Sequence, residues 1–184
     1  PARATHFTDR TQELARLLAD AQPGRVVTLC GPGGFGGQRA FADAAWQIEP
    51  ARFPDGIIFH SFYGQPSLNV ALEHIARSFG VDPQPSPASA ALRALAGKRA
   101  LLLLDGTEDA ENLAAILDIR GECGVIVTSR NRRDAAAERQ DVTPLPTGEA
   151  VSLLIACGGV DLFGAEFGDF PRNRRQGRRR NDAE

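Results

Sequence analysis

A glycine-rich turn is the first stretch of this sequence whose residue types predict chemistry. It follows the apolar run Val26 to Cys30 and precedes a stretch with helical spacing of apolar residues. Glycines let successive backbone N–H groups converge on a phosphate, and the N-terminus of the next helix adds its positive end. The predicted phosphate-binding residues are Gly31, Pro32, Gly33, Gly34, Phe35, Gly36, Gly37 and Gln38.

The turn departs from the phosphate-loop pattern G-x-x-x-x-G-K-[ST] at two positions. Gly31 and Gly36 match its two glycines. Gly37 replaces the lysine that neutralises the β- and γ-phosphates, and Gln38 replaces the hydroxyl that binds Mg²⁺. The Gln38 carbonyl oxygen is a weaker and differently placed metal ligand. Losing a charge-assisted contact costs about 1.5–3 kcal/mol, so we expect backbone binding of phosphate to persist at reduced affinity.

An aspartate ends the most apolar run of the chain. Leu101 to Leu104 lead directly into Asp105, which is the arrangement of a Walker B strand. Such an aspartate reaches Mg²⁺ through a water molecule beside the phosphate loop. Either Glu108 or Asp109 could orient the attacking water, so the predicted catalytic residues are Asp105, Glu108 and Asp109. The ordinary alternative is an aspartate that forms a turn with Gly106.

A second apolar run, Gly124 to Thr128, leads through Ser129 to Arg130. At the end of a neighbouring parallel strand, Arg130 can face the γ-phosphate and sense its presence. The ordinary alternative is a surface arginine. Ligands of open α/β sheets bind at the carboxyl ends of strands. The glycine turn, Asp105 and Arg130 all follow such ends, which favours one shared site.

These features need a scaffold that brings strand ends together. Apolar runs without helical spacing predict buried strands, and apolar residues three and four apart predict helices. The expected helices cover 9–20, 38–49, 67–79, 88–96, 110–117 and 149–157, and the expected strands cover 26–30, 56–62, 100–104, 124–128 and, at an edge, 141–145. This alternation predicts an α/β fold, a parallel β-sheet with helices on both faces, which is the P-loop NTPase core.

Length and composition predict one main domain and no membrane span. The chain has 184 residues, and 42% are hydrophobic, which is enough for a folded core. No apolar run is longer than that of Ala100 to Leu104, which is far shorter than the roughly 20 residues of a spanning helix. We expect a nucleotide-binding domain at 1–159 and an irregular, flexible, arginine-rich segment at 160–184. Because the sequence starts at Pro1 and has no Met, we expect a fragment of a longer protein.

Charge and cysteine usage narrow the expected partners and compartment. Residues 171–184 hold six arginines against two acidic residues, whereas the net charge of the whole chain is −2. The acidic body makes nucleic acid an unlikely partner, except through this basic tail. Cys30, Cys123 and Cys157 lack metal-ligand spacing and are expected to be buried free thiols. With no secretion signal in view, the expected location is cytoplasmic.

Together the motifs resemble the STAND class of P-loop NTPases, close to the NB-ARC type of bacterial multidomain regulators. The resemblance covers about residues 7–158. Its most specific stretch is Cys30 to Gly36, which is similar to the family's phosphate loop. Leu101 to Gly106 resembles the Walker B strand, and Val127 to Arg130 resembles the sensor strand.

The resemblance implies further roles. Residues 7–10, Phe-Thr-Asp-Arg, look like the family's element beside the adenine, with Asp9 in place of its glycine. This puts Phe7 and Arg10 on the adenine side. Such proteins are implied to hold ADP at rest, to exchange it for ATP on a signal and then to form homo-oligomers. Their partners are the nucleotide and other domains of the same longer chain.

The expected function is therefore an ADP/ATP-binding switch domain of a STAND-type signalling protein, with Mg²⁺ and with weak or absent hydrolysis. Gly37 and Gln38 leave enzymatic activity open. One alternative is a pseudo-NTPase scaffold or protein-interaction module that no longer binds nucleotide. Another is a competent ATPase that uses unconventional groups. The retained Asp105 and Arg130 favour nucleotide binding, because a pure scaffold does not need them.

Overall fold

The computed structural model describes residues 11–31, 47–131 and 138–142. Within them lies a five-stranded sheet with the order β2-β3-β4-β1-β5. The strands are β1 (Val26–Cys30), β2 (Ile57–Ser61), β3 (Leu101–Asp105), β4 (Gly124–Ser129) and β5 (Glu138–Asp141). All neighbouring strands are parallel, so the prediction of a parallel sheet is confirmed.

The two most apolar runs form the central strands because parallel strands are covered on both faces. Every residue of β3 and of β4 is buried. Leu102 pairs with Val125 and Leu104 with Val127, so β3 and β4 run in register to the same edge of the sheet. Asp105, the last residue of β3, and Arg130, the residue after β4, therefore lie at that shared edge.

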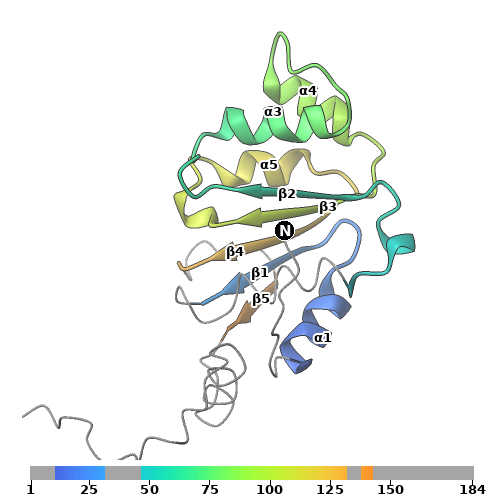
Figure 1. Cartoon of the computed structure of the whole chain (residues 1–184), viewed down its shortest axis with the longest axis vertical. Helices are drawn as coiled ribbons and strands as arrows, with labels where there is room; N and C mark the ends of the chain where they lie inside the picture. The colour runs from blue at the N-terminus through green and yellow to red at the C-terminus, as the bar shows by residue number, and fades with distance from the viewer. Residues whose placement is uncertain (1–10, 32–46, 132–137, 143–184) are drawn as a thin grey trace, which may run out of the picture.

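Helices cover both faces of the sheet (Figure 1). One core cluster joins three helices to one face of the sheet, and a second cluster joins another helix to the opposite face. The helices on the first face are α3 (Leu68–Ser78), α4 (Pro87–Leu95) and α5 (Leu113–Ile119), and the helix on the opposite face is α1 (Thr11–Asp20). Two short 3-10 helices, η1 (Pro50–Arg52) and η2 (Thr107–Asp109), lie in connections between these elements. The predicted α/β fold, with helices on both faces of a parallel sheet, is thus confirmed.

Side-chain caps explain where two of the helices begin. The Ser86 side chain accepts a hydrogen bond from the Ser89 N–H at the start of α4, and Asn112 accepts one from the Ala115 N–H at the start of α5. Such caps satisfy N–H groups that have no partner within the helix.

None of the helices in the described ranges has the length and apolar character of a bilayer-spanning segment.

Strand β5 begins earlier than the sequence pattern indicates. The expected edge strand covered 141–145, whereas β5 starts at Glu138, which pairs with Val27. Gln140 is its one buried side chain, so backbone pairing with β1 rather than apolar content defines this strand. Three predicted segments lie outside the described residues: the part of the edge strand after residue 142, the helix at 149–157 and most of the helix at 38–49.

One buried polar group lies in the layer between β2 and α3. His60 is 5% exposed, and its Nε2 atom has no hydrogen-bond partner. Its ring packs edge-on against Phe62, with the ring centroids 4.8 Å apart. Burial lowers the pKa of His60, and the nearby His74 lowers it further. The fold therefore favours the neutral form of this imidazole over the charged form.

This burial predicts a loss of stability in mild acid. The folded-state pKa of His60 lies below the unfolded-state value of about 6.5, so the unfolded chain binds a proton that the native state does not. The free energy of unfolding should fall as the pH drops through that value, by at most about 1.4 kcal/mol per pH unit from this group. Urea unfolding of the wild type and His60→Phe across this range should show a shallower dependence in the variant. Parallel pH profiles would contradict the assignment.

Candidate functional site

Three of the predicted site residues follow strands that end at one edge of the sheet. Gly31 follows β1, Asp105 ends β3, and Arg130 follows β4. The parallel register places Cys30 opposite Ser129, and the Gly31 N–H donates to the Ser129 carbonyl oxygen at 3.2 Å. The carboxyl edge of the sheet therefore brings these three positions together, as the strand order requires.

Asp105 is held in one orientation by the strands on either side of it. Its side chain is almost fully buried, with the residue 2% exposed. The Thr128 hydroxyl of β4 donates to Asp105 Oδ1 at 2.6 Å, and the Ser61 hydroxyl of β2 donates to Oδ2 at 3.4 Å. A buried carboxyl without such partners would cost about 1–3 kcal/mol or more. The neighbouring strands thus fix a carboxyl group at the sheet edge.

The turn after Asp105 depends on a glycine. Gly106 has φ +69° and immediately precedes η2, and its N–H donates to the Thr128 hydroxyl oxygen at 3.0 Å. The Thr107 hydroxyl then donates to the Thr128 carbonyl oxygen at 3.1 Å. The turn is therefore fastened to β4 twice, and it directs Glu108 back towards the end of that strand.

Glu108 meets Arg130 and Tyr63 at this edge. The Arg130 backbone N–H donates to Oε2 of Glu108 at 3.1 Å, and its Nε donates to Oε1. The Tyr63 hydroxyl also donates to Oε1, at 3.1 Å, and the guanidinium of Arg130 lies 5.0 Å from the Tyr63 ring centroid. Both oxygens of Glu108 are thus engaged in a cluster of three side chains from three strand ends.

The electrostatics of the cluster favour an ionised Glu108 and a protonated Tyr63. Burial alone would raise the pKa of Glu108, but hydrogen bonds from the side chain and backbone of Arg130 and from Tyr63 outweigh it and hold the pKa below its usual value. Burial, together with the charge of Glu108, raises the pKa of Tyr63 to about 12. Glu108 is accordingly a carboxylate, and Tyr63 remains a hydrogen-bond donor at neutral pH.

Sequence reasoning identified part of this arrangement. Asp105 and Arg130 lie at the edge where they were expected, and Glu108, of the two candidate water-orienting carboxylates, turns towards Arg130, whereas Asp109 is exposed. Thr128, Ser61 and Tyr63 were not identified as site residues. Their one signal in the sequence is that each lies within two residues of the end of an expected strand.

Gly31 has a steric role that is independent of any phosphate. A Cβ atom at Gly31 would lie 3.0 Å from the Cβ and the carbonyl oxygen of Val142. The glycine therefore allows the chain after β1 to pass the end of β5. A glycine at this position is weaker evidence for phosphate binding than the charged groups at the same edge.

The other predicted binding residues lie outside the described residues. These are the rest of the phosphate loop from Pro32 to Gln38 and the adenine-side residues Phe7 and Arg10. Their roles remain predictions. Within the described ranges, no group of three or more His, Cys, Asp or Glu side chains is arranged to hold a metal ion.

Sequence comparison relates the chain to part of a longer regulator. It is 31% identical over 183 residues to the regulatory protein AfsR of Streptomyces griseus and 29% identical over 187 residues to AfsR of Streptomyces coelicolor. Each match covers 90% of this chain and 19% of the relative, so the chain spans about a fifth of the relatives' length. No protein-family model matches the chain.

Structural comparison establishes the fold. Cdc6p of Pyrobaculum aerophilum superposes with a TM-score of 0.66 at 14% identity, over 84% of this chain and 50% of that one. The Orc1 protein of Aeropyrum pernix, solved in complex with DNA, superposes with a TM-score of 0.66 at 15% identity, over 85% and 50% of the two chains. Both likenesses agree with the parallel sheet order in showing a P-loop NTPase core fold.

The packing of the turn after β3 predicts a contrast between two glycine substitutions. Gly106 and Gly64 both have positive φ, +69° and +72°, so alanine at either should cost roughly 1 kcal/mol of backbone strain. At Gly106 the new Cβ would also lie 2.7 Å from the Tyr63 ring, whereas at Gly64 nothing lies within 4 Å. Urea unfolding should show that Gly106→Ala loses about 1–3 kcal/mol more than Gly64→Ala.

A double variant controls for this interpretation. Removal of the aromatic ring by Tyr63→Ala in the Gly106→Ala background should cost less than Tyr63→Ala in the wild type, because the steric conflict is relieved. Equal losses for the two glycine variants would show that the turn and Tyr63 are not in contact.

Proposed function

We propose that this chain is the nucleotide-binding switch domain of a longer regulatory protein of the STAND, NB-ARC type, which binds ADP or ATP with Mg²⁺ and hydrolyses ATP weakly or not at all. The observation that carries the proposal is the grouping of Asp105, Glu108 and Arg130 at the carboxyl edge of a P-loop NTPase core fold. Packing explains the apolar strands, but it does not require three charged groups at their ends.

Arg130 supplies the positive charge that a phosphate group at this edge would meet. Its guanidinium is half exposed, with 51% of the side chain accessible, and the hydrogen bonds and charge of Glu108 raise its pKa. Arg130 must leave Glu108, or share its N–H groups between the two anions, to contact a phosphate. Its proposed role as a sensor therefore includes a change in the Glu108–Arg130 pair.

Asp105 suits a water-mediated role towards Mg²⁺. Magnesium is bound in proteins through one or two carboxylates together with substrate phosphates and waters, rather than by a cage of protein ligands. Asp105 supplies one buried, fixed carboxyl group with hydroxyl neighbours, which fits that mode. When bound, Mg²⁺ would neutralise phosphate charge, which matters here because Gly37 stands where the phosphate-loop lysine is expected.

Weak hydrolysis is supported by the state of Glu108. A general base must lie within hydrogen-bond reach of the water it activates, and Glu108 keeps few of the about four acceptor positions of a carboxylate open for that water. Both oxygens of Glu108 accept hydrogen bonds from Arg130, and one also accepts from Tyr63. Gly37 and Gln38 would add to this deficit by removing a charge and a metal ligand. The same two residues favour the alternative, a scaffold that no longer binds nucleotide.

The length of the relatives supports partners within the same longer chain. The regulatory proteins matched here are about five times as long as the matched segment. We propose that neighbouring domains complete the nucleotide site and read its state, and that the ATP-bound form self-associates.

The proposed role of Asp105 predicts a selective loss of Mg²⁺ dependence. In calorimetric titrations, Mg²⁺ should tighten ATP binding to the wild type. In Asp105→Asn, the Mg²⁺-dependent increase in affinity should be about tenfold smaller, which corresponds to about 1.4 kcal/mol. Stability should change little, because the asparagine oxygen can still accept from Thr128. Asp118→Asn, an exposed change on α5, is the matched control. Equal Mg²⁺-dependent affinity in Asp105→Asn and wild type would remove Asp105 from the site.

Restoring the missing phosphate-loop groups should increase affinity. Gly37→Lys with Gln38→Thr reinstates the pattern G-x-x-x-x-G-K-[ST] and should tighten ATP binding roughly 10- to 150-fold. A lysine introduced at the exposed Ala19 of α1 controls for added charge. A double variant that binds no better than the control would favour the scaffold interpretation.

A further inference from the structure

A cavity opens between α3 and β2, which is one of the two edge strands of the sheet. Its volume is about 440 Å³, and it is lined by Phe59, His60, Ser61, Tyr63, Gln65, Val70 and His74. The cavity shares the Ser61 and Tyr63 wall with the carboxyl-edge site. Its two imidazoles take no part in that site, and neither sequence motif nor fold assigns them a role.

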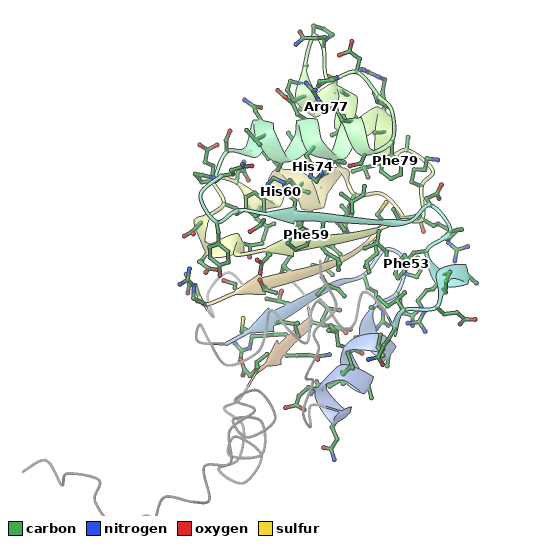
Figure 2. The ribbon with its side chains drawn as sticks, in the orientation of Figure 1. Phe53, Phe59, His60, His74, Arg77 and Phe79 are labelled. Atoms are coloured by element: carbon green, nitrogen blue, oxygen red, sulfur yellow. The ribbon has the colours of Figure 1, made fainter. Side chains whose placement is uncertain are left out.

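The two imidazoles come from different elements and lie close together. His60 lies on β2 and His74 on α3, and Figure 2 shows them close together between these elements. Their ring centroids are 5.5 Å apart, with the ring planes tilted by 41°. Two imidazoles that share one tetrahedral zinc ion at about 2.0–2.1 Å have centroids roughly 5 Å apart. The observed spacing is therefore close to that of a shared ion.

The deeper imidazole has a binding atom without a partner. His60 is 5% exposed, and its Nε2 has no hydrogen bond. A neutral imidazole carries one lone pair and one N–H, and buried groups of both kinds are almost always satisfied in native proteins. Phe62 packs edge-on against the ring and offers no acceptor or donor. A residue that lines the cavity thus carries a buried nitrogen that no protein group satisfies.

The outer imidazole is placed for access from solvent. His74 is exposed on α3, and Val70, four residues earlier and 42% exposed, lies on the same side of the helix. Gln65 adds an amide group to the same wall. An ion between the two imidazoles would thus be reached from outside, and the cavity leaves room for water or a small ligand at its remaining coordination positions.

We propose that His60 and His74 form a binding site for a divalent transition-metal ion, with two imidazole ligands and the remaining positions open. Imidazole nitrogen favours zinc, copper and nickel over magnesium and calcium. The site therefore does not compete for the Mg²⁺ that the carboxyl edge is proposed to use.

Calorimetric titration of Zn²⁺ into the tag-free chain without nucleotide tests this site. The wild type should bind one equivalent. His74→Ala and His60→Phe should each lose at least about tenfold in affinity, since even partners outside the coordination shell of a metal typically contribute 10- to 100-fold. His6→Ala, which removes the remaining histidine of the chain, is the matched control and should bind like the wild type.

Imidazole ¹⁵N chemical shifts give a direct readout that a purely structural role would not move. Zn²⁺ should shift one ring nitrogen of His60 and one of His74, and neither nitrogen of His6. Because His74 is exposed, His74→Ala should fold even if His60→Phe does not. Absence of Zn²⁺ binding to the wild type, binding unchanged in His74→Ala, or shifts confined to His6 would each overturn the proposal. Since no nucleotide is present, these outcomes are independent of the proposed switch function.

Discussion

The Thr128 hydroxyl is the contact on which the candidate site depends. It donates to Asp105 at 2.6 Å and accepts from the Gly106 N–H at 3.0 Å. One side chain of β4 therefore orients the carboxyl group at the end of β3 and fastens the first peptide of the following turn. That turn carries Glu108 to Arg130, which lies two residues beyond Thr128 on the chain. The charged cluster at the edge thus follows from the in-register pairing of β3 and β4.

The apolar pattern of the sequence is sufficient to predict the sheet and the edge at which its charged residues lie. Runs such as Leu101 to Leu104 are buried on both faces, and parallel strands end together, so Asp105 and Arg130 lie at the same edge. The pattern is not sufficient for Tyr63, because its contact with Glu108 requires β2 to lie beside β3 and the turn after β3 to fold back. It also misplaced β5, where Gln140 is the one buried side chain.

The charged groups at the carboxyl edge point to nucleotide more strongly than the glycines do. Gly31 is needed to avoid Val142, so a glycine at that position is compatible with either a binding site or a scaffold. Asp105 differs, because burying a carboxyl group at a sheet edge costs free energy unless hydroxyl groups of both neighbouring strands turn towards it. The Glu108–Arg130 pair differs as well, because it keeps an arginine at the edge where a phosphate would lie. The nucleotide proposal therefore depends on the charged groups more than on the glycines.

Backbone amide chemical shifts during titration with ADP are the sharpest test for a nucleotide at the carboxyl edge, because they locate the bound nucleotide as well as detecting it. We expect shifts at Gly31, at Gly106 to Glu108 and at Arg130, with little change at α4 on the far side of the helical layer. Shifts that cluster away from the carboxyl edge, or no shifts at millimolar ADP in a chain extended to include its neighbouring domain, would contradict this expectation.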